Sequence, residues 1–256
     1  MDKQTHRLRM FAGPNGSGKS TIKQKITEKL GADQMGVIVD PDEIEAIIHQ
    51  NHLIDFRNYN INISKEEIIN GLNNSSVLEK QDLRAEIPQL EVIDNLIRFS
   101  KVRINSYFAS AISEMIRSNL IQSKQSFSFE TVMSHHSKIE LLKFAQEQSY
   151  RTYLYYVATD DADINVERVK NRVFKGGHDV SADKIKERYT RSIDLLKTAL
   201  LFTNRAYVFD NSGDESILMI EITDGKNWEV KSNTVHPWFD STYEYLKEHS
   251  ERTIHS

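Results

Sequence analysis

Apolar residues recur along this chain in two alternating patterns. Short apolar runs predict strands, and longer stretches with apolar residues three or four positions apart predict helices. The predicted strands are residues 7–12, 36–40, 125–131, 151–159 and 206–210. The predicted helices are residues 20–30, a helix that begins at Pro41, and residues 136–148, 163–174 and 181–202. Strands that alternate with helices indicate a mostly parallel sheet covered on both faces, a three-layer α/β/α sandwich.

Residues 52–124 depart from this alternation, because their apolar residues repeat mainly at helical spacing. We expect this block to be a mostly helical insertion within a single domain of residues 1–256, and to cover the substrate. The remaining predicted elements are a hairpin at residues 217–231 with Asp224-Gly225 at its turn, and a helix at residues 237–249.

The segment between the first strand and the first helix carries the strongest motif. It fits G-x-x-x-x-G-K-[ST], a P-loop, in the required order of strand, loop and helix. Its glycines let successive N–H groups surround the phosphates of a nucleotide, at the positive end of the helix dipole. We expect Lys19 to contact the β- and γ-phosphates and Ser20 to ligate Mg²⁺. The predicted ATP-binding residues are Gly13, Pro14, Asn15, Gly16, Ser17, Gly18, Lys19, Ser20 and Thr21. The predicted fold is therefore that of a P-loop NTPase.

Asp40 and Asp42 follow the second predicted strand. Ligands of parallel α/β sheets bind at the carboxyl ends of the strands, so a carboxylate there can face the γ-phosphate and contact a substrate. One of the two acids can act as the base that takes a proton from a substrate hydroxyl. The alternative is that either residue only caps the helix that begins at Pro41.

Glu130 and Thr131 end the third predicted strand and lie at the same edge of the sheet. A carboxylate and a hydroxyl at this point can bind a polyol, a sugar or a metal-bound water. The alternative is a polar pair at the end of a strand without a function in binding.

Residues 165–191 carry eight basic and four acidic side chains, a local net charge of +4. The basic side chains lie on two predicted helices joined by Gly176-Gly177, and we expect residues 163–202 to form a lid over ATP. The planar guanidinium group matches phosphate oxygens, so lid arginines can stabilise the transferred phosphoryl group. The candidates are Arg172, Arg188 and Arg191. The alternatives are solvated helix faces or a weak nucleic-acid patch.

Two further patterns are interpreted as structural. Residues 210–213 match the D-x-x-G of GTPases, but no N-K-x-D motif follows, so we expect a turn near the nucleotide base. Tyr153, Tyr155 and Tyr156 lie on one predicted strand, where aromatic residues usually pack on a sheet.

Composition narrows the possible functions. The chain has 256 residues and no cysteine, which excludes disulfides, thiolate catalysis and cysteine-ligated metals. The formal net charge is −4, whereas nucleic-acid binders usually show a basic footprint. The polar first residues and the absence of a long apolar run predict neither a signal peptide nor a spanning helix, and we expect a cytoplasmic protein.

Taken together, these motifs resemble those of the zeta-toxin-like P-loop kinases. The resemblance rests on F-A-G-P-N-G-S-G-K-S-T at 11–21, V-D-P-D-E-I at 39–44, F-E-T-V-M-S at 129–134, Y-L-Y-Y-V-A-T at 153–159, R-V-K-N-R-V-F-K-G-G-H-D-V at 168–180, R-Y-T-R-S at 188–192 and A-Y-V-F-D-N-S-G at 206–213. It covers about two thirds of the chain and fails mainly over residues 52–104.

The resemblance implies an ATP-dependent kinase of UDP-N-acetylglucosamine that phosphorylates a sugar hydroxyl. It places the base on Asp42, the glutamate that binds the substrate on Glu130, and the lid arginines on Arg172 and one of Arg188 or Arg191. The chain departs from the toxins after Glu130, where Thr131-Val132 replaces Gly-Thr, and Ser134 replaces an arginine.

We therefore expect an ATP- and Mg²⁺-dependent kinase of a small-molecule hydroxyl. Two alternatives stay open: a P-loop ATPase that acts on nucleic acid, and a toxin-like module held inactive by an antitoxin-like protein partner.

Overall fold

The computed structural model describes residues 5–174, 176, 179–234, 236–249 and 251–252. The chain forms two compact units. The first unit contains residues 1–35 and 130–256, and the second contains residues 36–129. Each unit is described separately below.

The first unit is built on a sheet with the strand order β11-β10-β9-β8-β7-β1. These strands are β1 (Arg7–Ala12), β7 (Arg151–Ala158), β8 (Arg205–Asp210), β9 (Ile217–Thr223), β10 (Asn227–Val230) and β11 (Glu251–Arg252). Strands β1, β7 and β8 are parallel, β9 is antiparallel to both β8 and β10, and β11 is parallel to β10. The carboxyl ends of β1, β7 and β8 therefore lie at one edge of the sheet.

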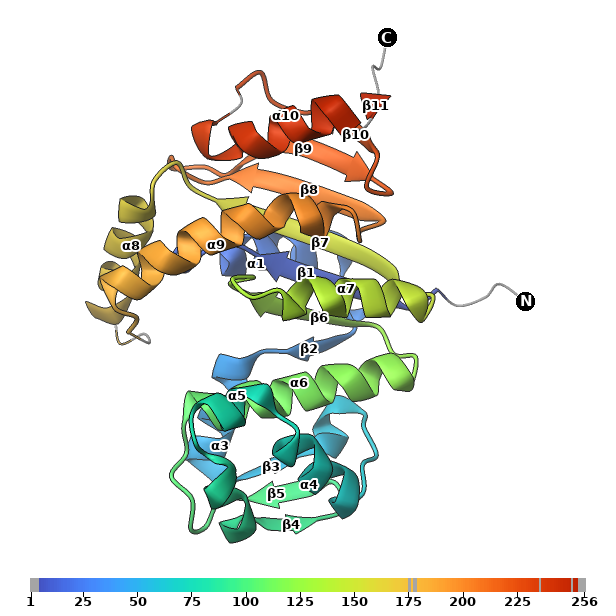
Figure 1. Ribbon diagram of the computed structural model, residues 1–256, viewed down its shortest axis with the longest axis vertical. Helices are drawn as coiled ribbons and strands as arrows, with labels where there is room; N and C mark the ends of the chain where they lie inside the picture. Colours follow the sequence, from blue (N-terminus) through green and yellow to red (C-terminus); the bar gives the residue numbers. More distant parts are fainter. Residues whose placement is uncertain (1–4, 175, 177–178, 235, 250, 253–256) are drawn as a thin grey trace. The chain divides into compact units, whose positions relative to one another are not determined.

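Helices cover both faces of this sheet (Figure 1). The helices of this unit are α1 (Lys19–Leu30), α2 (Ala32–Met35), α7 (Ser137–Glu147), α8 (Ala162–Phe174), α9 (Ala182–Leu200), a 3-10 helix (Pro237–Phe239) and α10 (Asp240–His249). Ile22 of α1 packs against Phe11 and Tyr155 on one face. Successive side chains of a strand point to opposite faces, so Tyr156 faces the other side, where its hydroxyl bonds to Ser192 Oγ of α9 at 3.0 Å.

The second unit combines helices with short strands. Its helices are α3 (Pro41–Asn51), a 3-10 helix (Phe56–Tyr59), α4 (Lys65–Asn73), α5 (Ser76–Lys80), a 3-10 helix (Arg84–Gln89) and α6 (Ser106–Gln122). Its strands are β2 (Val37–Val39), β3 (Leu53–Asp55), β4 (Glu91–Ile93), β5 (Leu96–Arg98) and β6 (Phe127–Thr131), whose last two residues belong to the first unit. Strands β2 and β6 are parallel, and β3-β5-β4 is a separate antiparallel sheet.

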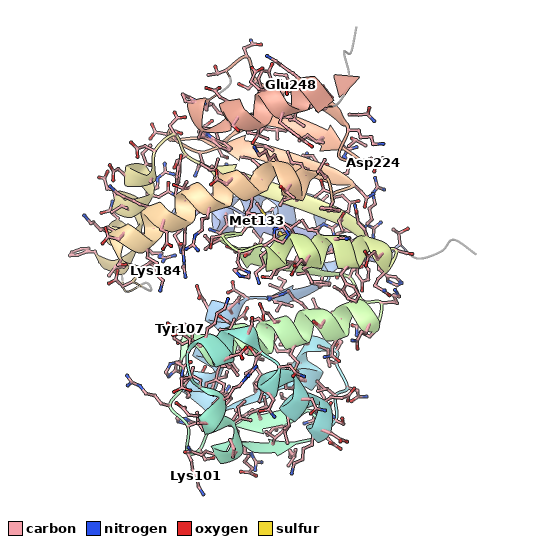
Figure 2. The ribbon with its side chains drawn as sticks, in the orientation of Figure 1. Lys101, Tyr107, Met133, Lys184, Asp224 and Glu248 are labelled. Atoms are coloured by element: carbon pink, nitrogen blue, oxygen red, sulfur yellow. The ribbon has the colours of Figure 1, made fainter. Side chains whose placement is uncertain are left out.

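The alternating pattern predicted the main strands and helices within a few residues. The hairpin is also confirmed: β9 and β10 pair, and Asp224 (labelled in Figure 2) and Gly225 take φ values of 51° and 64° at its turn. Residues 52–124 contain several helices, as predicted, and also the sheet β3-β5-β4, which the sequence did not predict. Each of its strands has only three residues, too few for an alternating pattern to stand out. Within the described residues, no helix is both long enough and apolar enough to cross a membrane.

Candidate nucleotide-binding site

The predicted P-loop connects β1 to α1 in a conformation that only glycine can take at two points. Gly13 has φ +140°, and a Cβ on it would lie 1.9 Å from the carbonyl oxygen of Val157. Gly16 has φ +77°, and a Cβ on it would lie 2.6 Å from the carbonyl oxygen of Asn165. The loop is therefore pressed against the end of β7 and the first turn of α8, and both glycines are needed for this contact.

The start of α1 is suited to an anion. Its N-cap, Gly18, is in the left-handed conformation and supplies no side-chain cap, and the first turn of the helix contains no acid. Lys19 Nζ donates to the carbonyl oxygen of Pro14 at 2.8 Å, so the ammonium group lies over the loop. Within the described part of the chain, the buried Ser17 Oγ has no hydrogen-bond partner. Glycine backbone, helix terminus and lysine together are a donor set that fits a triphosphate.

Two asparagines brace the loop from neighbouring elements. Asn165 of α8 is fully buried, donates from Nδ2 to the carbonyl oxygen of Asn15 at 2.6 Å, and accepts a short hydrogen bond from Thr159. Asn211 follows β8 and donates from Nδ2 to the carbonyl oxygen of Ser17 at 2.8 Å. Sequence reasoning missed the first contact and described the second residue only as part of a turn. Asn165 could have been singled out in the sequence, because it is a polar residue on the apolar face of a predicted helix.

Glu130 lies beside the first turns of α1. Its Oε2 accepts a hydrogen bond from Ser20 Oγ at 2.9 Å, and its Oε1 lies 2.6 Å from Lys23 Nζ. The structure thus brings together Glu130 and Ser20, two residues that the sequence predicted separately. Oxygen atoms of a hydroxyl and a carboxylate are the ligands that Mg²⁺ prefers, directly or through water, so these residues fit the ion.

Thr131, the last residue of β6, makes a separate contact. Its Oγ1 accepts a hydrogen bond from the backbone N–H of Met133 at 3.1 Å, which shapes the turn after β6. Met133 (Figure 2) takes φ 53° and is buried. The hydroxyl of Thr131 therefore has a structural partner in this conformation.

Helices α8 and α9 form a hairpin with its own small apolar core of Val166, Val169 and Ile185, against which Val173 and Val180 pack. Lys186 Nζ and Asp163 Oδ1 add an ion pair of 2.6 Å between the two helices. This is the pair of helices predicted as a lid. Gly176 takes φ +89°, and Gly177 lies outside the described residues.

The arginines of this hairpin differ in their surroundings. Arg168 donates to the carbonyl oxygens of Asn211 and Gly213 at 2.7 and 3.2 Å, which fixes the loop after β8. Arg191 pairs with Glu187 of the same helix at 2.8 Å. The predicted lid residue Arg172 is exposed on α8, and Arg188 is half-buried on α9.

The hairpin is anchored to the end of β7. The hydroxyl of Tyr189 on α9 donates to the carbonyl oxygen of Thr159 at 2.6 Å. Burial is the main cause that raises the pKa of Tyr189, and the charges of Asp161, Asp160 and Asp210 add to it. The tyrosine therefore stays a neutral donor and keeps this anchor.

The C-terminal segment is attached to the same edge of the sheet. His236 Nδ1 lies 2.9 Å from Asp160 Oδ1, and Trp238 Nε1 donates to the buried Asp210 at 3.0 Å. The hydroxyl of Ser212 also donates to Asp210, at 2.8 Å. These bonds fix the ends of β7 and β8 next to the loop that contacts Ser17.

Asp40 and Asp42 belong to the second unit. Asp40 is the N-cap of α3, and its Oδ1 accepts from the backbone N–H of Asp42 at 2.9 Å. Asp42 lies in the first turn of α3 with an exposed side chain. Of the two acids, Asp40 thus has the capping contact, and the carboxylate of Asp42 is accessible to solvent.

The fold and the loop define a P-loop protein with a mostly parallel sheet. The chain belongs to the zeta toxin family, whose sequence model matches residues 59–223. An uncharacterized protein of Haemophilus influenzae is 25% identical over 179 residues, which cover 70% of this chain and 89% of the relative.

Solved structures share the fold at low identity. The structure of AvrRxo1-ORF1:-ORF2 with ATP has a TM-score of 0.56 at 12% identity, and the complex with sulphate ions has 0.55 at 14%. Each match covers 96% of this chain and 64% of the other chain. The PezAT toxin-antitoxin system of Streptococcus pneumoniae matches at a TM-score of 0.47 and 13% identity, over 100% of this chain and 81% of the other.

Proposed function

We propose that the protein is an ATP- and Mg²⁺-dependent kinase that transfers the γ-phosphate to a hydroxyl group of a small molecule. The observation that carries the proposal is the P-loop: Gly13 and Gly16 are seated where a Cβ cannot fit, Lys19 lies over the loop, and α1 begins without a side-chain cap. This arrangement supports binding of a nucleotide triphosphate at the start of α1.

The transfer forms a bond between the acceptor oxygen and the γ-phosphorus and breaks the bond between that phosphorus and the β,γ-bridging oxygen, which leaves as part of ADP. The proton of the acceptor hydroxyl passes to the carboxylate of Asp42, whose side chain is accessible, while Asp40 caps α3. Lys19, Arg172 and one of Arg188 or Arg191 stabilise the charge on the transferred group. Magnesium, held through Ser20, neutralises charge on the β- and γ-phosphates when it is bound.

UDP-N-acetylglucosamine is the first acceptor that we propose. Membership of the zeta toxin family, the position of Glu130 at the carboxyl end of β6 and the position of Asp42 in the first turn of the helix after β2 support it. We assign residues 52–124 to the cover of the acceptor and residues 163–202 to a lid over ATP, in a cytoplasmic enzyme.

A protein partner is a second element of the proposal, because the AvrRxo1-ORF1 structures that share this fold are complexes with AvrRxo1-ORF2. A small protein that co-purifies with the chain from its native host and blocks ATP binding would support it. A nucleic-acid function is less well supported, since three cations of the basic stretch, Arg168, Lys186 and Arg191, have partners within the protein.

The experiment that tests the proposal is incubation with ATP, Mg²⁺ and a metabolite extract, followed by mass spectrometry for acceptors that gain one phosphate. UDP-N-acetylglucosamine is tested first as a pure compound. The expected result is a phosphorylated product with the wild type and none with Lys19→Ala. If ATP binds but no metabolite gains phosphate, the kinase proposal is wrong.

A further inference from the structure

The segment that follows β8, residues 210–213, has no role in the reaction described above, yet it touches the P-loop. The side chain of Asn211 donates from Nδ2 to the carbonyl oxygen of Ser17 at 2.8 Å. A Cβ on Gly18 would collide with the same nitrogen atom. Asn211 therefore lies directly against the peptide group that joins Ser17 to Gly18.

This contact fixes the direction of a backbone donor. The peptide bond between Ser17 and Gly18 is planar and trans, so its carbonyl group and its N–H group point in opposite directions. Because Asn211 holds the carbonyl oxygen, the N–H of Gly18 points away from Asn211. Backbone N–H groups are the donors with which a P-loop binds phosphate. Asn211 can thus orient one of these donors without touching the nucleotide itself.

The backbone of Asn211 is held on both sides. Its N–H donates to the carbonyl oxygen of Ala158 at 2.8 Å, and its carbonyl oxygen accepts from Arg168 Nη1 at 2.7 Å. The N–H of Ser212 donates to Asp210 Oδ2 at 2.9 Å, which closes a turn around Asn211. The place of the asparagine is therefore set by the end of β7, by α8 and by Asp210.

Asp210 links this turn to the C-terminal segment. Its carboxylate is buried, with the residue only 1% exposed, and Oδ1 accepts from Ser212 Oγ at 2.8 Å and from Trp238 Nε1 at 3.0 Å. Hydrogen bonds to an ionised acceptor are stronger than those between neutral groups. Trp238 is itself buried, and its ring lies 5.9 Å from that of Tyr156. One carboxylate thus joins Trp238 to the turn that contains Asn211.

We propose that Asp210, Asn211 and Trp238 are positioning residues for phosphate binding. Trp238 holds Asp210, Asp210 holds the turn, and Asn211 orients the N–H of Gly18. This inference rests on the proposed function, because it concerns the triphosphate at the P-loop. It assigns residues 210–213 to the phosphate end of the nucleotide instead of the base, and it makes ATP affinity depend on the C-terminal segment.

The test measures the binding of ATP with Mg²⁺, and of inorganic tripolyphosphate, by calorimetry. Tripolyphosphate carries no base, so it reports on the phosphate site alone. We expect Asn211→Ala to weaken the binding of both probes by about 3- to 10-fold, the range for one lost hydrogen bond. The matched control is Asn204→Ala, just before β8, where the side chain bonds to Thr152 and Asp224. This control should lose stability but bind both probes as the wild type does.

Trp238→Phe tests the contribution of the C-terminal segment. It removes the N–H donor to Asp210 and keeps an aromatic ring beside Tyr156. We expect both probes to bind about 3-fold more weakly. Because Trp238 acts through Asn211, the change should have little further effect in the Asn211→Ala background. Trp228→Phe, the matched change at a buried position of β10, should leave both affinities unchanged.

The tripolyphosphate result decides between the two possible roles of this segment. If folded Asn211→Ala binds tripolyphosphate as the wild type does, the inference is overturned, whether or not its affinity for ATP falls. Additive losses in the Asn211→Ala, Trp238→Phe double variant would show that Trp238 does not act through Asn211, and would overturn that part. Failure of the wild type to bind ATP at all would overturn the proposed function as well.

Discussion

At the scale of single residues, the site depends on backbone positions that admit no side chain. The P-loop pattern in the sequence predicted which residues these are, but not what they touch. Asn165 and Asn211 support the loop from elements that lie 150 and 194 residues away from their partners. No local pattern encodes such contacts, so the sequence could not predict them.

Gly13 allows the most direct test of close packing in the loop. A methyl group at this position meets a backbone oxygen that cannot move aside, so Gly13→Ala should lower the free energy of unfolding by about 3 kcal/mol or more. Gly31→Ala is the matched control, because Gly31 also has a positive φ but a methyl group on it would have no other atom within 4 Å. Gly31→Ala should lower the free energy of unfolding by about 1 kcal/mol. Urea unfolding measures both, and equal losses would contradict the proposed contact.

Asn165 tests whether the brace matters for nucleotide binding. Asn165→Asp keeps the shape of the side chain but replaces the N–H donor to Asn15 with an oxygen. We expect ATP to bind about 10-fold more weakly, since a buried hydrogen bond becomes a repulsive contact. Asn171→Asp, an exposed change on the same helix, serves as the control. Unchanged ATP affinity in a folded Asn165→Asp variant would show that the brace is not needed.

At the scale of elements, strands and helices with long apolar patterns were predictable, and the sheet β3-β5-β4 was not. The three tyrosines of β7 show why pattern reasoning succeeded there. Alternation along the strand places Tyr155 toward α1 and Tyr156 toward α9, as packing on a sheet requires. Tyr155 stacks between Phe11 and Tyr207, with ring centroids 4.7 and 5.1 Å away.

This stack predicts a loss of stability in alkali. Burial, the largest cause, raises the pKa of Tyr155 from 10.0 to about 12. A raised pKa stabilises the neutral form, so its contribution is complete below pH 10 and is lost as the pH rises through about 12. Two pKa units correspond to about 2–3 kcal/mol. Tyr155→Phe should therefore lose less stability than the wild type over this window in urea unfolding. If plots of unfolding free energy against pH are parallel for the two proteins, the raised pKa of Tyr155 is contradicted.

The hairpin of α8 and α9 is the element that we expect to act during phosphate transfer. Arg172→Ala should lower kcat by about 100-fold or more and leave ATP affinity nearly unchanged, because its charge is needed mainly in the transition state. Lys170→Ala, exposed on the same helix, is the control. Steady-state kinetics of Arg188→Ala and Arg191→Ala then identify the second lid arginine. Full kcat in Arg172→Ala would remove this residue from the mechanism.

At the scale of the whole molecule, the two compact units carry different candidate residues. The first unit carries the P-loop, Glu130 and the hairpin of α8 and α9, and the second carries Asp42. The order of strands and helices predicted that the P-loop, Asp42 and Glu130 lie near the carboxyl ends of parallel strands, which is where α/β proteins bind ligands. The acceptor could not be predicted in the same way, because the sequence analysis found no motif in residues 52–104 that specifies an acceptor.

The measurement that tests the account most directly is phosphate transfer to an identified acceptor by Asp42→Asn, compared with ATP binding by the same variant. The account predicts that product formation falls by about 100-fold or more while ATP affinity is retained, and that Glu43→Gln, in the same exposed turn of α3, behaves as the wild type. Full transfer by Asp42→Asn would contradict the assignment of the base.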